Sequence, residues 1–207
     1  MLEDYNLLIT QVVTLLAVLD PIGHTTLFLG ATSGLSHSDR RHTALVGVGV
    51  AYALLSVFGL IGQTILKAMG VSLLSFQIAG GAILFFFAIN MVLGSAQKEA
   101  DEKQTLSNVA IYPVATPIIA GPGSLLTVLL LMNNHRETPM QHVITLAALA
   151  LVMAVLLVAF IISGSIHRLI GASGAEVLRR VMGLILAALA VNMVLSALAI
   201  WLHLPPI

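Results

Sequence analysis

The sequence of 207 residues contains no cysteine and few charged residues. The missing cysteines exclude disulfide bonds, thiolate metal ligands and a cysteine nucleophile. Charged residues make up 9% of the chain, whereas soluble globular domains carry about 25%. Nine basic residues balance nine acidic ones, so the chain lacks the basic surface that a nucleic-acid partner requires. This composition excludes an ordinary water-soluble domain and argues against nucleic-acid binding.

Cofactor motifs are also missing. No G-x-x-x-x-G-K-[ST] segment occurs, so nothing predicts nucleotide binding. The seven histidines are scattered and form no H-x-x-x-H or H-x-x-E-H pair, so no metal site is predicted. The first residues, Met1-Leu2-Glu3-Asp4, lack the positive region of a cleavable signal peptide. We therefore expect no cofactor, no metal, and a first apolar segment that stays in the protein.

Long apolar segments dominate what is present. The chain is 58% hydrophobic with a mean hydropathy of +1.04, and a membrane-spanning helix needs about 20 predominantly apolar residues. Six segments qualify, at about 7–33, 43–66, 73–94, 109–132, 142–165 and 181–202. The sequence predicts an all-α integral membrane protein that forms one membrane domain over residues 1–207 in the lipid bilayer.

The basic residues of the connections predict the orientation. Loops on the cytoplasmic side of a membrane carry an excess of lysine and arginine. Lys67 and Arg136 fall on one side of the predicted spans, and the other side carries Arg40, Arg41, Lys98, Lys103, Arg168, Arg179 and Arg180. We expect this second side to be cytoplasmic, with the linker 95–108 on it and both termini extracytoplasmic, in a multi-pass protein of the cell (inner) membrane.

The two halves of the chain resemble each other. Residues 88–93 (AINMVL) match residues 190–195 (AVNMVL) at an offset of 102, and Gly81 matches Gly183 at the same offset. Chance similarity between apolar helices is the alternative interpretation. A three-span repeat must be inverted in its second copy, so we predict two inverted repeats, at about 7–94 and 109–203. Interrupted helices at corresponding places in such repeats indicate a transporter's binding site.

Each repeat contains one such interruption. Asp20, Pro21 and Gly23 interrupt the first span, and Gly121, Pro122, Gly123 and Ser124 interrupt the fourth. Proline removes a backbone donor and ends the preceding helix, but it suits the first position of a new one. We therefore predict that spans 1 and 4 are broken near the bilayer midplane. Each break begins a half-helix whose free amides form a site for an anionic group.

The two breaks differ in charge. Asp20 already places a carboxylate at the first half-helix, whereas the second has no acid in its span. A substrate carboxylate should prefer residues 121–124, and Asp20 should suit an ammonium group, a proton or another cation. A small zwitterion satisfies both ends. The alternative is that Asp20 is only a buried helix cap, although Ser or Asn would cap about as well without placing a charge in the membrane.

Three other polar residues are candidates. His24 is either a proton relay with Asp20 or a hydrogen-bond donor to a carbonyl freed by the break. Asn90 and Asn192 either line the substrate cavity or join helices to one another. Among the span hydroxyls only Ser124 is a site candidate, because threonines such as Thr25 and Thr26 can bond to their own helices. Gly80 and Gly81 favour close helix packing over ligand contact.

Three motifs in this order resemble the MarC family of six-span membrane proteins over essentially the whole chain: Asp20-Pro21-Ile22-Gly23 with Phe28-Leu29, Ile78-Ala79-Gly80-Gly81, and Ala120-Gly121-Pro122-Gly123. The resemblance implies secondary transport of small neutral amino acids, with proton-coupled uptake of glycine and alanine in some members. The family is also grouped with LysE-type exporters. This chain departs from the family pattern at His24, where Asn is usual, and at Thr26, where Pro is frequent.

The sequence thus predicts a carrier of small neutral amino acids, driven by a proton or another cation, and not an enzyme. One alternative is an exporter of another small metabolite. Another is a rhomboid-type intramembrane serine protease built on Ser124 and His24, although an aspartyl protease would need a second membrane carboxylate. The sequence leaves the substrate, the transport direction and the oligomeric state open.

Overall fold

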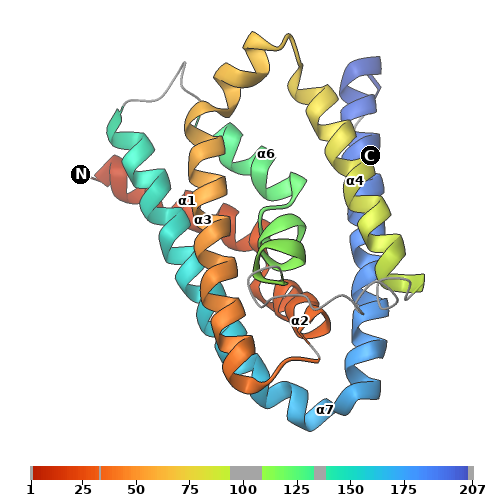
Figure 1. The fold of residues 1–207 in the computed structure, drawn as a ribbon. Coiled ribbons are helices and arrows are strands. Elements are labelled where there is room, and N and C mark those ends of the chain that lie inside the picture. The colour runs from red at the N-terminus through yellow and green to blue at the C-terminus, as the bar shows by residue number, and fades with distance from the viewer. Residues whose placement is uncertain (1, 33, 94–108, 133–138, 205–207) are drawn as a thin grey trace.

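The computed structural model describes residues 2–32, 34–93, 109–132 and 139–204, and within them all regular structure is helical. The helices are α1 (Leu2–Leu19), α2 (Pro21–Ala31), α3 (His37–Ala68), α4 (Leu73–Leu93), the π-helix η2 (Ala110–Ile119), α6 (Pro122–Leu131) and α7 (Pro139–Leu202) (Figure 1). The predicted linker 95–108 lies outside the described residues, as do Lys98, Lys103 and Arg136.

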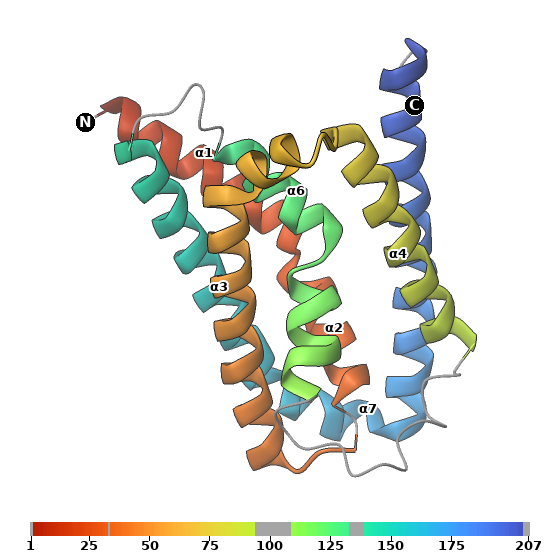
Figure 2. The same ribbon diagram turned by 45° about the horizontal axis from the view of Figure 1, so that its top comes forward.

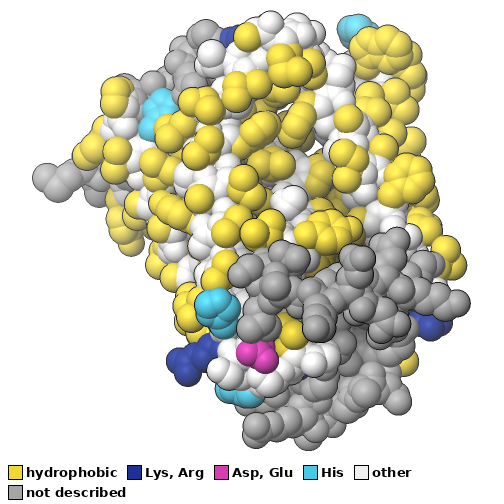
Figure 3. Space-filling view, viewed as in Figure 1, with side chains coloured by type: hydrophobic (Ala, Val, Ile, Leu, Met, Phe, Trp, Pro, Cys, Tyr) yellow, Lys and Arg dark blue, Asp and Glu magenta, His cyan; other side chains and the backbone are white. Residues whose placement is uncertain are grey.

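The helices confirm a six-span membrane protein. Five segments are long and apolar enough to cross a bilayer: Tyr5–Ala31, His37–Ala68, Leu73–Leu93, Pro139–Ser163 and Gly183–Leu202. Residues Ala110–Ile119 and Pro122–Leu131 complete the set as a pair bent by 60°. Apolar side chains cover most of the face shown in Figure 3, and charged side chains appear toward its upper and lower ends, as a bilayer requires.

The sequence predicted the last two spans as separate helices, but in the structure they are two parts of one continuous helix. Helix α7 continues through the connection and bends at the lower end of the molecule (Figure 1). The corresponding connection of the first repeat contains Gly70, whose φ of 67° ends α3 in the left-handed region that favours glycine. The residue 102 positions later is Ala172, and no proline occurs between Pro139 and Pro205. The second repeat has Gly171 and Gly174 near this position, but α7 continues through both.

Two groups of helices flank the broken segments. We call α4 and residues Gly183–Leu202 of α7 the outer pair; these two helices run side by side in both views (Figures 1 and 2). Helices α1, α3 and the first half of α7 form the opposite group, and α2, η2 and α6 lie between the two groups. Both chain ends lie at the same end of the bundle in Figure 2. The side of the membrane that this end faces stays a prediction.

The outer pair reveals the symmetry of the repeats. A Cβ at Gly81 would lie 2.8 Å from Cγ2 of Val194 and 2.9 Å from the carbonyl oxygen of Ala190. A Cβ at Gly183 would lie 2.9 Å from Cγ2 of Val92 and 3.1 Å from the carbonyl oxygen of Ala88. Each partner is the other's equivalent at the offset of 102. Such reciprocal contacts arise from a two-fold axis, here between antiparallel helices, which supports the inverted repeat and explains both glycines as packing residues.

Helix α2 is held by two contacts near its C-terminal end. Its Phe28 stacks on Phe160 of α7, with ring centroids 4.2 Å apart and planes at 5°. At its C-terminal end, Nη2 of Arg40 donates a 3.1 Å hydrogen bond to the carbonyl oxygen of Thr32. Arg40 is buried, and its positive charge lies at the negative end of the α2 dipole, which stabilises it there. The half-helix is therefore a fixed part of the core.

Candidate functional site at the two helix breaks

The first break occurs at Asp20. This residue has φ 27° and ψ 83°, a positive φ that is uncommon for a residue with a side chain. It is the N-cap of α2 and Pro21 is the first helical residue, as the sequence predicted. Its side chain, however, makes no capping hydrogen bond and is exposed. The carboxylate is thus not a buried cap, and it remains available to a ligand or a proton.

The start of α2 is open around that carboxylate. A Cβ at Gly23 would collide with Oδ2 of Asp20, so only glycine leaves room for the carboxylate in this position. The amides of Ile22 and Gly23 have no backbone acceptor among the described residues, because the first such bond into the helix runs from His24 N to Asp20 O at 2.9 Å. Ile22 is 81% exposed. The first break therefore offers a carboxylate and two accessible amides.

The second break has the same amides in a more enclosed setting. Gly121 is the N-cap of α6 and Pro122 is its first residue. Leu125 N bonds Gly121 O at 2.9 Å, so the amides of Gly123 and Ser124 have no backbone acceptor in the described segments. Gly121, Pro122 and Ser124 are buried, and Gly123 is partly exposed. A Cβ at Gly123 would meet only Sδ of Met193, at 4.0 Å, so space remains beside these amides.

Prolines shape the segment before the second break in a way that sequence reasoning missed. Pro113 and Pro117 lie inside η2, where Tyr112 and Thr116 have non-helical backbone angles. The last bond of η2 runs from Ala120 N back five residues to Ala115 O at 2.8 Å, the spacing of a π-helix. Each proline removes a donor from the α-helical pattern. Three prolines at spacings of four and five residues were the available signal for this distortion.

His24 joins the two breaks. Its Nε2 lies 2.8 Å from the carbonyl oxygen of Ile118, near the end of η2, and its Nδ1 lies 3.1 Å from the carbonyl oxygen of Asp20. Both partners are acceptors only. A neutral imidazole donates from one nitrogen, so both hydrogen bonds form together only when the ring is protonated. The alternative prediction, in which His24 bonds carbonyls freed by the breaks, describes the observed contacts, and these contacts leave a proton-dependent bond in the site.

The other candidate side chains do not join the two breaks. Thr25 donates to Pro21 O at 2.6 Å and Thr26 to Gly23 O at 2.7 Å, so both bond to their own helix. Ser124 makes no hydrogen bond to His24 among the described residues. Pro122 packs against Gly80, where a Cβ would lie 2.5 Å from the proline Cβ. Asn90 and Asn192 are exposed on the outer pair, and no hydrogen bond joins them to either break among the residues that the structure describes.

An apolar groove adjoins the second break. It has a volume of about 270 Å³ and is lined by Leu54, Val57, Phe58, Ile61, Ile65, Thr116, Ala120 and Leu125. Thr116 and Ala120 precede the break and Leu125 follows it, so the groove reaches the chain on both sides of Gly121. No cluster of three or more His, Cys, Asp or Glu residues suited to a metal ion occurs in the part of the chain that was described.

Comparison with known proteins assigns the chain to a family. The profile described as "MarC family integral membrane protein" matches residues 5–202. The chain belongs to the MarC family. It is 34% identical to the UPF0056 membrane protein of Pyrococcus abyssi, over 96% of this chain and 97% of the relative.

Two other relatives cover similar lengths. The chain is 32% identical to the UPF0056 membrane protein of Archaeoglobus fulgidus, over 90% of this chain and 89% of the relative. It is 30% identical to the UPF0056 inner membrane protein YhgN of Escherichia coli, over 95% and 98%. No solved structure matches this MarC protein. It is thus a multi-pass integral membrane protein.

Proposed function

We propose that this MarC protein is a secondary transporter of small neutral amino acids, of the glycine and alanine class, coupled to protons. The observation that carries the proposal is the bond of His24 between the two breaks. This bond connects the first turn of α2, which begins beside the carboxylate, to the end of η2, the segment that precedes the second half-helix. A zwitterion has the complementary charges, because its carboxylate suits the amides of Gly123 and Ser124 and its ammonium group suits Asp20.

The same contacts support the proposed proton coupling. A protonated His24 donates to both carbonyl oxygens, whereas a neutral ring keeps only one of these bonds. Loss of the proton therefore weakens the connection between α2 and the end of η2. Asp20 is the second candidate for the coupled proton, since its carboxylate is exposed beside the free amides. Transport would then alternate between a connected and a released arrangement of the two breaks.

The E. coli relative is named as an inner membrane protein, and we propose the same cell (inner) membrane location here, with both termini extracytoplasmic. The partners of this carrier are the lipid bilayer, a small amino acid, and a proton or another coupling cation. No cofactor and no nucleic acid enters this proposal, and we propose that the protein is not an enzyme.

The deciding experiment measures uptake by the purified protein in proteoliposomes. Radiolabelled glycine or alanine should accumulate only under an inward proton gradient, and Asp20→Asn should abolish this accumulation because the variant removes the only carboxylate at the breaks. Asp39→Asn is the matched control, since Asp39 is a partly exposed residue in the first turn of α3 and accepts a hydrogen bond from Ser36. Accumulation that needs no gradient, or that persists in Asp20→Asn, contradicts the proton-coupled carrier.

The groove beside the second break favours one alternative: an exporter of a larger amphipathic metabolite. Its lining is almost wholly apolar and its volume of about 270 Å³ suits a branched or thioether side chain. Counterflow distinguishes the two functions. Liposomes loaded with unlabelled leucine or methionine should accelerate labelled substrate entry if the groove is used, and should leave entry unchanged if only glycine and alanine are carried.

A further inference from the structure

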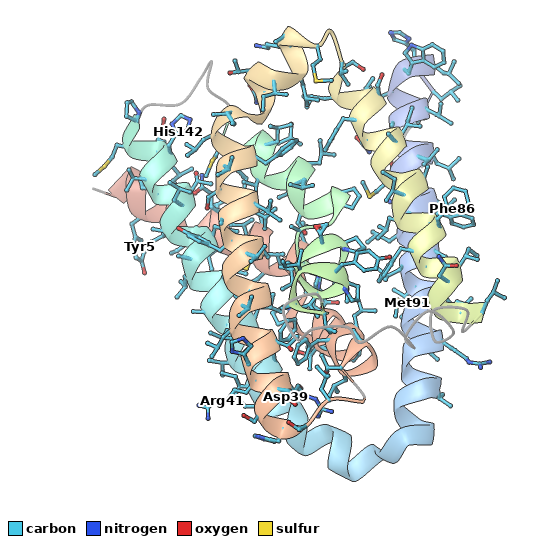
Figure 4. All side chains as sticks on the ribbon, viewed as in Figure 1. Tyr5, Asp39, Arg41, Phe86, Met91 and His142 are labelled. Atoms are coloured by element: carbon cyan, nitrogen blue, oxygen red, sulfur yellow. The ribbon has the colours of Figure 1, made fainter. Side chains whose placement is uncertain are left out.

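The two asparagines of the repeats lie on the exposed face of the outer pair. On α4, Asn90 follows Ile83 and Phe86 and precedes Leu93 at helical spacings of three and four, and all four residues are exposed. On α7, Asn192 follows the exposed residues Ile185 and Leu189 in the same way. Figure 4 shows Phe86 pointing away from the bundle. Each repeat thus carries one amide on an otherwise apolar outer face.

Both amides lie deep in the membrane. The reciprocal contacts of Gly81 and Gly183 centre the two-fold axis of the repeats near residues 85–86 and 187–188. In inverted repeats this axis lies in the membrane plane, near the midplane. Asn90 and Asn192 follow the axis by four to five residues, which is about 7 Å along a helix. Since the hydrocarbon layer extends about 15 Å to each side of the midplane, both amides are at hydrocarbon depth.

Neither side chain has a hydrogen-bond partner in the described part of this chain. By contrast, Gln77 of α4 and Gln63 of α3 donate to the carbonyl oxygens of Met193 and Leu129 at 3.0 and 3.1 Å. Acyl chains offer no hydrogen bond, so an exposed amide at this depth is unfavourable unless another polypeptide supplies its partner. Asparagine side chains drive association of membrane helices for this reason.

The face is complementary to itself. Phe86 projects from it with 70% of its surface exposed. Directly beside Phe86 is an apolar groove of about 250 Å³, lined by Gly81, Ala82, Phe85, Phe86, Ala190, Val191, Val194 and Leu195. A primary amide carries both donors and an acceptor, so two asparagines can satisfy each other. An identical face therefore supplies the projecting ring, the groove that receives it, and the amide partners.

We propose that the outer pair is the interface of a homodimer, in which this face binds the same face of a second copy. Phe86 of each copy enters the apolar groove of the other, and Asn90 and Asn192 each form an amide–amide hydrogen bond with the same residue of the other copy. A two-fold interface of this kind is self-complementary by necessity. It leaves both helix breaks, on the other side of α4, within a single chain.

The absence of cysteine makes cross-linking a direct test. Ile83→Cys places one thiol on the proposed interface without altering Phe86 or the asparagines, and a short bis-maleimide should join two copies in native membranes. Val13→Cys is the matched control, because Val13 is a 58% exposed apolar residue on α1, which belongs to the opposite group of helices. Absent cross-linking at position 83, or equal cross-linking at position 13, overturns the proposal.

A second measurement tests the amides. Photobleaching steps of a fluorescently tagged protein in dilute proteoliposomes should show two copies per particle, and Asn90→Leu/Asn192→Leu should weaken association at least tenfold. Thermal unfolding of the double variant should match that of the original protein, since neither amide bonds within the chain. Single copies in the original protein, or unchanged association in the double variant, contradict the dimer.

Discussion

The two helix breaks present the same pair of free amides but reach them by different routes. At the first break one proline and one left-handed residue, Asp20, suffice, and α1 and α2 still pass as one span, Tyr5–Ala31. At the second, Pro113 and Pro117 force a π-helix and the chain bends by 60°. The first break is exposed and carries a carboxylate, whereas the second is mostly buried and carries none.

The symmetry of the repeats therefore holds for the backbone geometry and not for the chemistry of the two breaks. The contacts of Gly81 and Gly183 reproduce one another at an offset of 102, so the scaffold is nearly two-fold. Charge and access differ between the breaks, and under the proposed function this difference would give a dipolar ligand a single preferred orientation. A symmetric site could not distinguish the two ends of a zwitterion.

The largest expected effect comes from filling the space at the second break. Gly123→Val places a branched side chain beside the free amides of Gly123 and Ser124, where only Met193 lies nearby. Loss of two hydrogen bonds to a charged group costs about 3 kcal/mol or more, so substrate Kd should rise about a hundredfold. Binding by isothermal calorimetry checks this, with Gly49→Val in the open surface of α3 as the control. An unchanged Kd would remove the carboxylate site from residues 121–124.

A smaller effect should come from the packing that supports the second break. A Cβ at Gly80 would lie 2.5 Å from Cβ of Pro122, and overpacking of this kind costs about 1–3 kcal/mol. Gly80→Ala should therefore lower the thermal unfolding temperature of the purified protein, whereas Gly49→Ala should not. Equal unfolding temperatures for both variants would mean that α4 does not support Pro122.

His24→Gln tests the connection between the breaks. Glutamine keeps a hydrogen-bond donor but cannot be protonated, so one link remains and its dependence on pH disappears. The rate of gradient-driven uptake should fall about tenfold, in line with the loss of one charge-assisted bond. The pH profile of substrate exchange should also flatten, because glutamine carries no proton that titrates. A profile that keeps its shape would assign the proton to another group.

Ser124→Ala should have the smallest effect. A carrier that uses backbone amides keeps them in this variant, so uptake should fall by no more than about threefold, about the value of one neutral hydrogen bond. An intramembrane serine protease would instead lose its nucleophile and all cleavage of a membrane-protein substrate. Cleavage of a membrane-protein substrate that is measured in the original protein and lost in Ser124→Ala would favour the enzyme.

Much of the fold was predictable because bilayers impose simple rules. Apolar length alone located the six spans, and the repeated AINMVL and AVNMVL segments predicted the inverted halves. Asp20-Pro21 and Gly121-Pro122 predicted where two half-helices begin, since proline has one favoured place in a helix. The π-helix of η2 was not predicted, because the sequence does not show which distant groups replace the backbone hydrogen bonds that Pro113 and Pro117 remove.

Local sequence therefore determined the spans, the breaks and the charge difference between them, since each follows from side-chain polarity or from the missing donor of proline. The hydrogen bond that connects His24 of α2 to Ile118 O, 94 residues away, is visible only in the tertiary structure. The tertiary structure also decided that Asn90 and Asn192 lie on the outer face, away from the breaks. All faces of a membrane helix are similarly apolar, so the sequence does not reveal which face contacts protein and which contacts lipid.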